Sequence, residues 1–98
     1  MIGTLVTFRY PGDFDAAKIR EIAETARPRF ENMPGLRSKV FTVNANAHEA
    51  VNVYVWESEA AARAFFDEEL LQRVTALYGV RPSIAFVEIA ALVDNATT

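Results

Sequence analysis

The sequence predicts an α+β fold built on a four-stranded antiparallel sheet with helices on one face. Four β-rich runs lie along the chain, two amphipathic segments with helical spacing interrupt them, and a short turn joins the two middle runs. The chain has 98 residues, of which 51% are hydrophobic and 23% are charged, so it can build one core. We therefore expect a single domain over residues 1–98, with a frayed tail at 94–98.

The first strand and the first helix follow from the opening third of the chain. Residues 2–10 mix β-branched and aromatic residues and stop at a Pro-Gly turn signal. A helix is expected next, with Asp13 or Asp15 as its N-cap, because apolar residues then recur at helical spacing. Pro28 lacks an N–H group and crowds the preceding turn, so the helix should kink or finish as a looser turn near Arg27.

The second half of the chain repeats this pattern. Residues 36–44 and 50–56 are both β-rich and close enough for an antiparallel hairpin. Ser58 is a favourable N-cap for an apolar stripe that fits one bent helix or two short ones, and Gly79 is a favourable C-cap. The last β-rich run spans residues 83–93. The order β-α-β-β-α-β is that of the ferredoxin-like, or split βαβ, fold.

Both faces of the predicted sheet are apolar. Alternation on the third strand places Val51, Val53 and Val55 on one face, and Tyr54 and Trp56 on the other. Helices cover only one face in this fold, so the other needs a different cover. We therefore expect a homodimer in which two copies pack sheet to sheet.

Composition excludes several classes of protein. A net charge of −3 provides no basic surface for nucleic acid or anionic membranes, and no segment has the length of a membrane span. No cysteine is present, and no signal peptide is recognisable, so we expect a cytoplasmic protein without disulfides or thiolate metal sites. The acidic run Asp67 to Glu69 lacks a histidine and points in several directions on a helix, which indicates a solvated surface rather than a metal site.

Two quoted runs carry a family resemblance. VYVWESEAAARAFFD, after the strand in PGLRSKVFTVN, resembles the antibiotic biosynthesis monooxygenase family of dimeric α/β barrel proteins, and in particular its YdhR-like branch of small monooxygenases. The resemblance extends from the first strand to Val93. It implies oxygenation of an aromatic or polyketide-like phenol by dioxygen, with no metal, flavin or other cofactor, in a pocket between helices and sheet.

The resemblance also assigns site residues. Asn52 and Trp56 match the asparagine and tryptophan that lie four residues apart on the third strand of the family, which implies that both are catalytic. Members also use an arginine and a tyrosine deeper in the chain, for which Arg73 and Tyr78 are the candidates. Asn52 would stabilise the charge that develops on a substrate carbonyl, and Trp56 would stack on the substrate ring.

Further substrate-binding candidates come from the residues themselves. Tyr54 shares a strand face with Asn52, and Phe65 lies on the helical stripe that would roof that face. Arg9 has two readings: it could pair with Glu88 on the neighbouring fourth strand, or it could hold a phenolate or carboxylate at the pocket mouth or the dimer interface.

Two alternative functions remain open. A cyclase or isomerase on the same scaffold would need an acid or base, for which His48 or Tyr54 are candidates, although His48 lies in a polar turn. A small-ligand-binding barrel without turnover is the other alternative. Haem degradation is disfavoured, because the haem-binding branch has an axial histidine on the helix after the tryptophan strand and this sequence has none there.

Overall fold

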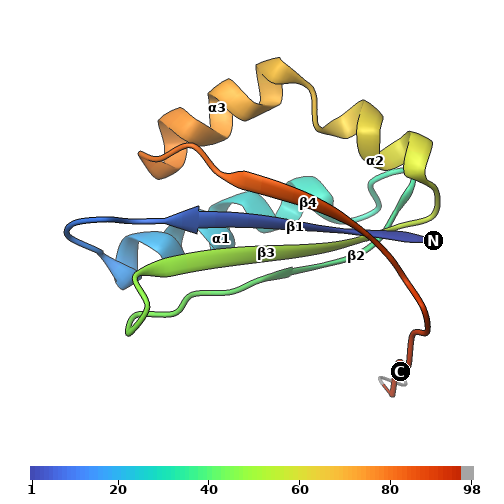
Figure 1. Ribbon diagram of the computed structural model, residues 1–98, viewed down its shortest axis with the longest axis horizontal. Coiled ribbons are helices and arrows are strands. Elements are labelled where there is room, and N and C mark those ends of the chain that lie inside the picture. The colour runs from blue at the N-terminus through green and yellow to red at the C-terminus, as the bar shows by residue number, and fades with distance from the viewer. Residues whose placement is uncertain (96–98) are drawn as a thin grey trace.

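The protein is described by a computed structural model over residues 1–95; of the tail expected to fray, positions 96–98 lie outside the described residues. The elements shown in Figure 1 are β1 (Ile2–Arg9), α1 (Ala16–Phe30), β2 (Leu36–Phe41), β3 (Glu49–Trp56), α2 (Glu59–Phe65), α3 (Glu68–Tyr78) and β4 (Ser83–Glu88). This confirms the predicted α+β class and element order, with the second helical region divided into two helices.

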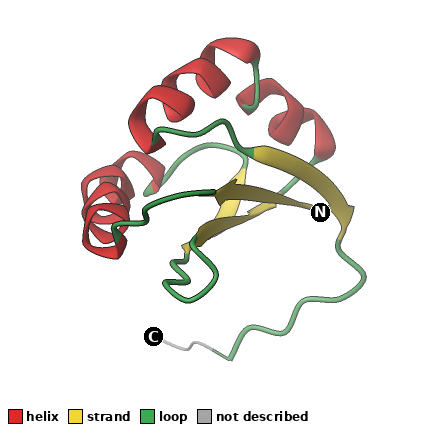
Figure 2. Cartoon of the chain, turned by 60° about the vertical axis from the view of Figure 1, so that its left-hand side comes forward, coloured by secondary structure: helices red, strands yellow, loops and turns green. Residues whose placement is uncertain are grey.

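The four strands form one antiparallel sheet in the order β2-β3-β1-β4. All three helices lie on the same side of this sheet (Figure 2). Within residues 1–95 no helix covers the opposite side, which we call the open face, and the chain after β4 runs past it (Figure 2). The sheet of a single chain does not close on itself. None of the helices in the described part of the chain is long and apolar enough to cross a membrane.

Capping residues satisfy free peptide groups at the start of α1, the start of α2 and the end of α3. Asp15 accepts a hydrogen bond from the Lys18 amide at 3.1 Å, so it is the N-cap of α1. Ser58 accepts from the Ala61 amide at 3.1 Å and starts α2 in the same way. Gly79 ends α3 with a φ of 86°, a left-handed conformation that glycine adopts without strain.

The first helix differs from expectation at its end, whereas the second helical region takes one of its two expected forms, two short helices. α1 continues through Pro28 to Phe30 instead of finishing near Arg27. Pro28 lies in the last turn, where its missing N–H removes one helical hydrogen bond, to the carbonyl of Glu24. Glu24 is exposed, so water can bind this carbonyl instead. The break between α2 and α3 occurs at Asp67, whose side chain accepts from the Leu70 amide at 2.8 Å and caps the new helix.

Two strands are shorter than predicted. β4 ends at Glu88 rather than at position 93, because its only neighbour is β1, which begins at Ile2 opposite Glu88. β2 ends at Phe41 rather than at position 44, although a single bridge from Asn44 to Glu49 closes the hairpin. The ends of β2 and β4 therefore depend on where a neighbouring strand is available for pairing, which composition alone does not show.

Burial along β3 alternates as predicted. Ala50, Asn52, Tyr54 and Trp56 are buried beneath the helices, while the valines between them are half-buried on the open face. The core lies between sheet and helices and consists of Val6, Phe8, Ile19, Ile22, Ala50, Tyr54, Trp56, Ala62 and Tyr78. Asn52 and Thr4 are the buried polar residues within residues 1–95.

Candidate active site

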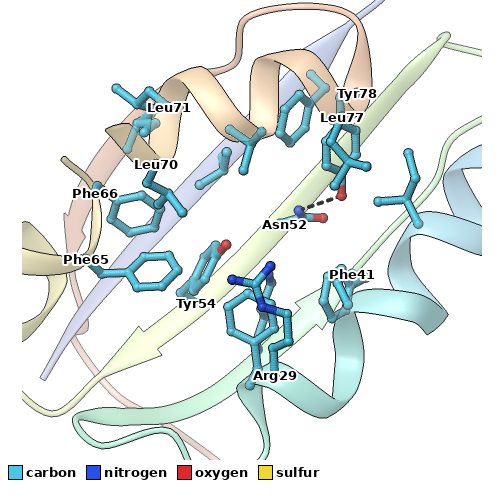
Figure 3. Close-up of a pocket in the computed structure, with 18 of the residues that line it drawn as sticks. Arg29, Phe41, Asn52, Tyr54, Phe65, Phe66, Leu70, Leu71, Leu77 and Tyr78 are labelled. Carbon is cyan, nitrogen blue, oxygen red and sulfur yellow. Dashed lines mark hydrogen bonds between the residues drawn. The ribbon is translucent and has the colours of Figure 1, made fainter. Parts of the chain in front are cut away.

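A pocket lies between the sheet and the helices. All four strands contribute to its floor, and α1, α2 and α3 contribute its walls (Figure 3). Most of the lining is apolar and includes Phe41, Phe65, Phe66, Leu70, Leu71 and Leu77. The cavity volume is about 80 Å³, which is below the range of about 300–1,000 Å³ typical of pockets for drug-sized ligands. A polycyclic ligand is therefore fully enclosed only if side chains of the walls move.

The polar centre of this pocket is a hydrogen bond between β3 and the end of α3. Asn52 Nδ2 donates to Tyr78 Oη at 3.2 Å, and both side chains are buried (Figure 3). Within residues 1–95, the Tyr78 hydroxyl has no acceptor for its own proton. It can therefore donate to an oxygen of a ligand, and the hydrogen bond that it accepts from Asn52 strengthens it as a donor.

Tyr78 is held rigidly. Its ring stacks on Phe8 with centroids 3.7 Å apart, and the Tyr10 hydroxyl donates to its backbone carbonyl at 2.7 Å. Burial raises the pKa of Tyr78, and the hydrogen bond from Asn52 opposes that rise. At neutral pH the hydroxyl is therefore a protonated donor in a fixed position.

Tyr54 and Trp56 are stacked neighbours with different exposure to the pocket. Their ring centroids are 5.6 Å apart at an interplanar angle of 7°. Tyr54 lines the pocket, whereas Trp56 is 1% exposed, lies outside the lining and donates its indole N–H to Thr4 Oγ1 at 3.1 Å. Burial, and secondarily Tyr78, raise the pKa of Tyr54 well above its usual value.

A β-bulge brings Lys39 of β2 onto the face that the helices cover. Leu36 pairs with Trp56, but the register then shifts, so that Lys39 rather than Ser38 stands opposite Tyr54. Strict alternation from Leu36 would have turned Lys39 to the open face, because side chains point to opposite sides at successive positions.

Three aromatic rings surround the Lys39 ammonium group. Nζ lies 3.4 Å from the ring centroid of Phe30, 4.0 Å from that of Phe41 and 4.4 Å from that of Tyr54. Burial, and then the Arg29 guanidinium, lower the pKa of Lys39 to about 7. The ring faces favour the charged form and act against this shift, so the group can exist in both protonation states in place.

A second cation stands at the pocket. Arg29, in the last turn of α1, extends its guanidinium toward Tyr54 (Figure 3). Within the described part of the chain, no carboxylate lies within ion-pair distance of Arg29 or Lys39. One side of an otherwise apolar pocket therefore carries positive charge that the protein itself does not neutralise.

The structure brings together four of the residues that the sequence nominated. Asn52, Tyr54, Phe65 and Tyr78 all line the pocket. Trp56, Arg9 and Arg73 do not: Trp56 lies in the core behind Tyr54, and both arginines are exposed.

The proposed pairing of Arg9 with Glu88 is wrong. Antiparallel register places Ile2 opposite Glu88, so that Arg9 lies at the other end of the sheet. Arg9 instead bonds Glu49 on β3, with Nε 3.1 Å from Oε2. The sequence correctly indicated that β1 and β4 are neighbours. It did not indicate which residues of the two antiparallel strands lie opposite one another.

His48 lies away from the pocket. It is exposed in the β2–β3 hairpin, where Nδ1 donates to the Gly12 carbonyl at 3.1 Å and the ring stacks on Phe14 with centroids 5.5 Å apart. Its φ of 53° reflects a turn position. Within residues 1–95, no three histidine or carboxylate side chains lie close enough together to hold a metal ion.

Lys39 and Arg29 are the charged pocket residues that sequence reasoning did not nominate. Lys39 was visible only as a charge within a β-rich run, and nothing in that run marks the bulge. Arg29 follows Pro28 directly, where the sequence indicated a loosening helix rather than a last turn facing the sheet.

Solved structures of similar proteins share this fold. The ActVA-Orf6 monooxygenase of Streptomyces coelicolor, solved in complex with nanaomycin D, is 24% identical, with a TM-score of 0.68 over 96% of this chain and 92% of that chain. SnoaB, a cofactor-independent oxygenase from Streptomyces nogalater solved as an asparagine-to-alanine mutant, is 17% identical, with a TM-score of 0.66 over 93% and 94%. A Nitrosomonas europaea protein of unknown function is 18% identical, with a TM-score of 0.73 over 98% and 95%.

The fold and the pocket define the class of protein: a ferredoxin-like α+β chain with an aromatic pocket between its helices and an open sheet. Residues 4–87 match the family described as "Putative mono-oxygenase ydhR", and the chain belongs to this mono-oxygenase family. The resemblance inferred from the sequence is thereby confirmed. No curated protein sequence matches the chain.

Proposed function

We propose that the protein is a cofactor-independent monooxygenase that oxidises an aromatic phenol with dioxygen in the pocket between helices and sheet. The observation that carries this proposal is the Asn52–Tyr78 pair, a hydrogen-bonded donor group in an otherwise apolar pocket of a mono-oxygenase family member. Similarity to a cofactor-independent oxygenase and to a monooxygenase solved with a small organic ligand supports the same choice.

The reaction needs no external reductant. Conversion of a phenol and dioxygen into a para-quinone and water removes the phenolic O–H and a ring C–H. One oxygen atom enters the quinone and the other leaves as water. The four electrons that the substrate loses are those that dioxygen gains, so the protein has only to bind, orient and deprotonate the substrate.

The pocket residues have separate roles in this scheme. The Tyr78 hydroxyl donates to the substrate oxygen on which negative charge develops, and Asn52 orients and polarises that hydroxyl. Tyr54 and Phe65 pack against the substrate ring and exclude water. Trp56 acts from behind, because it stacks on Tyr54 and fixes the position of that ring.

Oxygen uptake with a panel of single-ring, bicyclic and anthrone-type phenols tests the proposal. The wild-type protein, treated with a metal chelator, should consume one dioxygen per quinone formed. Phenol binding without oxygen uptake would contradict the proposal and favour a binding barrel. An isomerised product without oxygen uptake, lost in His48→Ala, would favour a cyclase or isomerase.

We also propose that the functional form is a homodimer. The open face of the sheet is apolar, and Val40 on it is 54% exposed. Val53 lies at its centre, paired with Leu5 on one side and Val40 on the other. A second copy packed sheet to sheet would cover these side chains.

A further inference from the structure

Oxygenation of a phenol requires a proton acceptor in the pocket, because the electron-rich phenolate transfers an electron to dioxygen more readily than the neutral phenol. Four ionisable side chains line the pocket within residues 1–95, and they are Arg29, Lys39, Tyr54 and Tyr78. Arginine stays protonated in proteins. Burial raises the pKa of both tyrosines, so they hold their protons at neutral pH. Lys39 is the remaining candidate.

The surroundings of Lys39 suit a proton acceptor. Nζ lies against the rings of Phe30, Phe41 and Tyr54. No carboxylate within the described residues forms an ion pair with it. The ring faces would stabilise the ammonium form once it has gained a proton. Positioning and stabilisation of the product state are therefore both present.

Lys39 also connects the pocket to solvent. Its side chain lines the internal pocket and, on the other side, the surface groove between α1 and β2, together with Arg27, Val40 and Thr42. A proton taken from a ligand inside can therefore leave to water outside. Among the other described lining residues of the internal pocket, only Phe41 also lines both neighbouring surface grooves, and it carries no ionisable group.

We propose that Lys39 is the general base that takes the phenolic proton of the substrate, an inference that rests on the proposed oxygenase function. In this step the phenolic O–H bond breaks, and its electron pair stays on the oxygen. The lone pair of Lys39 Nζ forms the new N–H bond. Nothing is oxidised or reduced, and the products are a phenolate and an ammonium group that attract each other.

The charged groups around Lys39 determine when it is neutral. Those that share the pocket or its two grooves with Lys39 are Arg20, Glu24, Arg27 and Arg29 of α1, Glu31 after it, Arg37 of β2 and the phenols of Tyr54 and Tyr78. Glu24 is engaged by Arg27 at 3.6 Å. Burial and the adjacent Arg29 lower the pKa of Lys39 to about 7, so a large share of the amine is neutral at physiological pH.

Three variants and two readouts test this role. In Lys39→Met and Lys39→Arg, kcat/KM for phenol oxidation at pH 7 should fall by about 10²–10⁴, the usual contribution of a general base. The remaining activity should rise with pH only where the phenol ionises in water. Lys39→Ala should regain activity with added methylamine, a rescue that a purely structural role would not give. Lys18→Met, at an exposed position of α1, is the matched control because Lys18 is the only other lysine.

The second readout does not require turnover. With two lysines in the chain, NMR of the Lys39 side chain should show it losing its proton near neutrality. A Lys39 that stays charged above pH 9, or an active Lys39→Met enzyme with an unchanged pH profile, would overturn the proposal while leaving the oxygenase function intact. An inactive wild-type protein whose Lys39 titrates near pH 7 would instead refute the oxygenase function, and the catalytic role with it.

Discussion

Tyr78 joins the polar centre of the pocket to the surrounding core. Its hydroxyl accepts a hydrogen bond from Asn52 at 3.2 Å, its ring stacks on Phe8, and its backbone carbonyl accepts a hydrogen bond from the Tyr10 hydroxyl. In the proposed function Asn52 and Tyr78 act on a ligand as one unit, so removing either side chain should remove most of the effect of both. Their contributions to turnover should therefore be strongly non-additive.

A double-mutant cycle measures this coupling. Asn52→Ala should lower kcat by about 10²–10³, the size found for loss of one donor to a developing oxyanion. Tyr78→Phe should cost a similar amount, and the double mutant little more than either. Purely additive losses would contradict a joint role. Thr25→Ala, at an exposed position on α1, is a control that should leave kcat unchanged.

The lowered pKa of Lys39 predicts that the free energy of unfolding depends on pH. Its pKa is about 7 in the folded protein and 10.5 as its ordinary value. Below pH 7 both states are protonated, and folding bears the full cost of burying the charge. Between pH 7 and 10.5 the unfolded state binds more protons, so stability rises with pH; above 10.5 the cost is gone.

The comparison is between wild type and Lys39→Met in urea unfolding at pH 6 and pH 10. The stability advantage of Lys39→Met should shrink by about 2–4 kcal/mol over this interval, since one pKa unit corresponds to about 1.4 kcal/mol and the rings offset part of the shift. Parallel changes in the two proteins would show that burial of Lys39 carries no such cost.

At the scale of elements, the sequence predicted what depends on periodicity. Alternation in β3 correctly placed Asn52, Tyr54 and Trp56 beneath the helices. It could not show that Trp56 lies too deep to reach the pocket, because depth depends on the helices packed above it. The position of Lys39 in the pocket could not be predicted for a different reason. One bulge after Leu36 reverses which side chains of β2 face the helices, and the sequence does not mark that bulge.

The break between α2 and α3 gives a prediction at the same scale. Asp67 caps α3, the helix that supplies Leu70, Leu71 and Tyr78 to the pocket. Asp67→Ala should lower the free energy of unfolding by about 1 kcal/mol, the usual cost of losing an N-cap. Urea denaturation provides the measurement, and Glu69→Ala, in the same first turn but not the cap, should change stability by less than half as much.

At the scale of the whole molecule, the fold leaves one sheet face without a cover. Helices bury one face, while Val40 at 54% and Val87 at 36% remain exposed on the other. Stable protein–protein interfaces bury about 1,200–2,000 Å² in total. A dimer through this face would also place β1 and β3, which carry the pocket floor, at the interface, so that assembly and activity should be linked.

Val53→Glu tests this arrangement, because Val53 lies at the centre of the open face between Leu5 and Val40. The wild type should sediment at about twice the chain mass of 10.9 kDa, and Val53→Glu should sediment as a monomer, since two carboxylates would meet near the dimer axis without partners. Ala76→Glu, on the exposed side of α3, adds the same charge and should remain dimeric. A monomeric wild type at micromolar concentration would refute the dimer. If Val53→Glu were instead folded, monomeric and fully active, the dimer would stand but its link to the pocket would not.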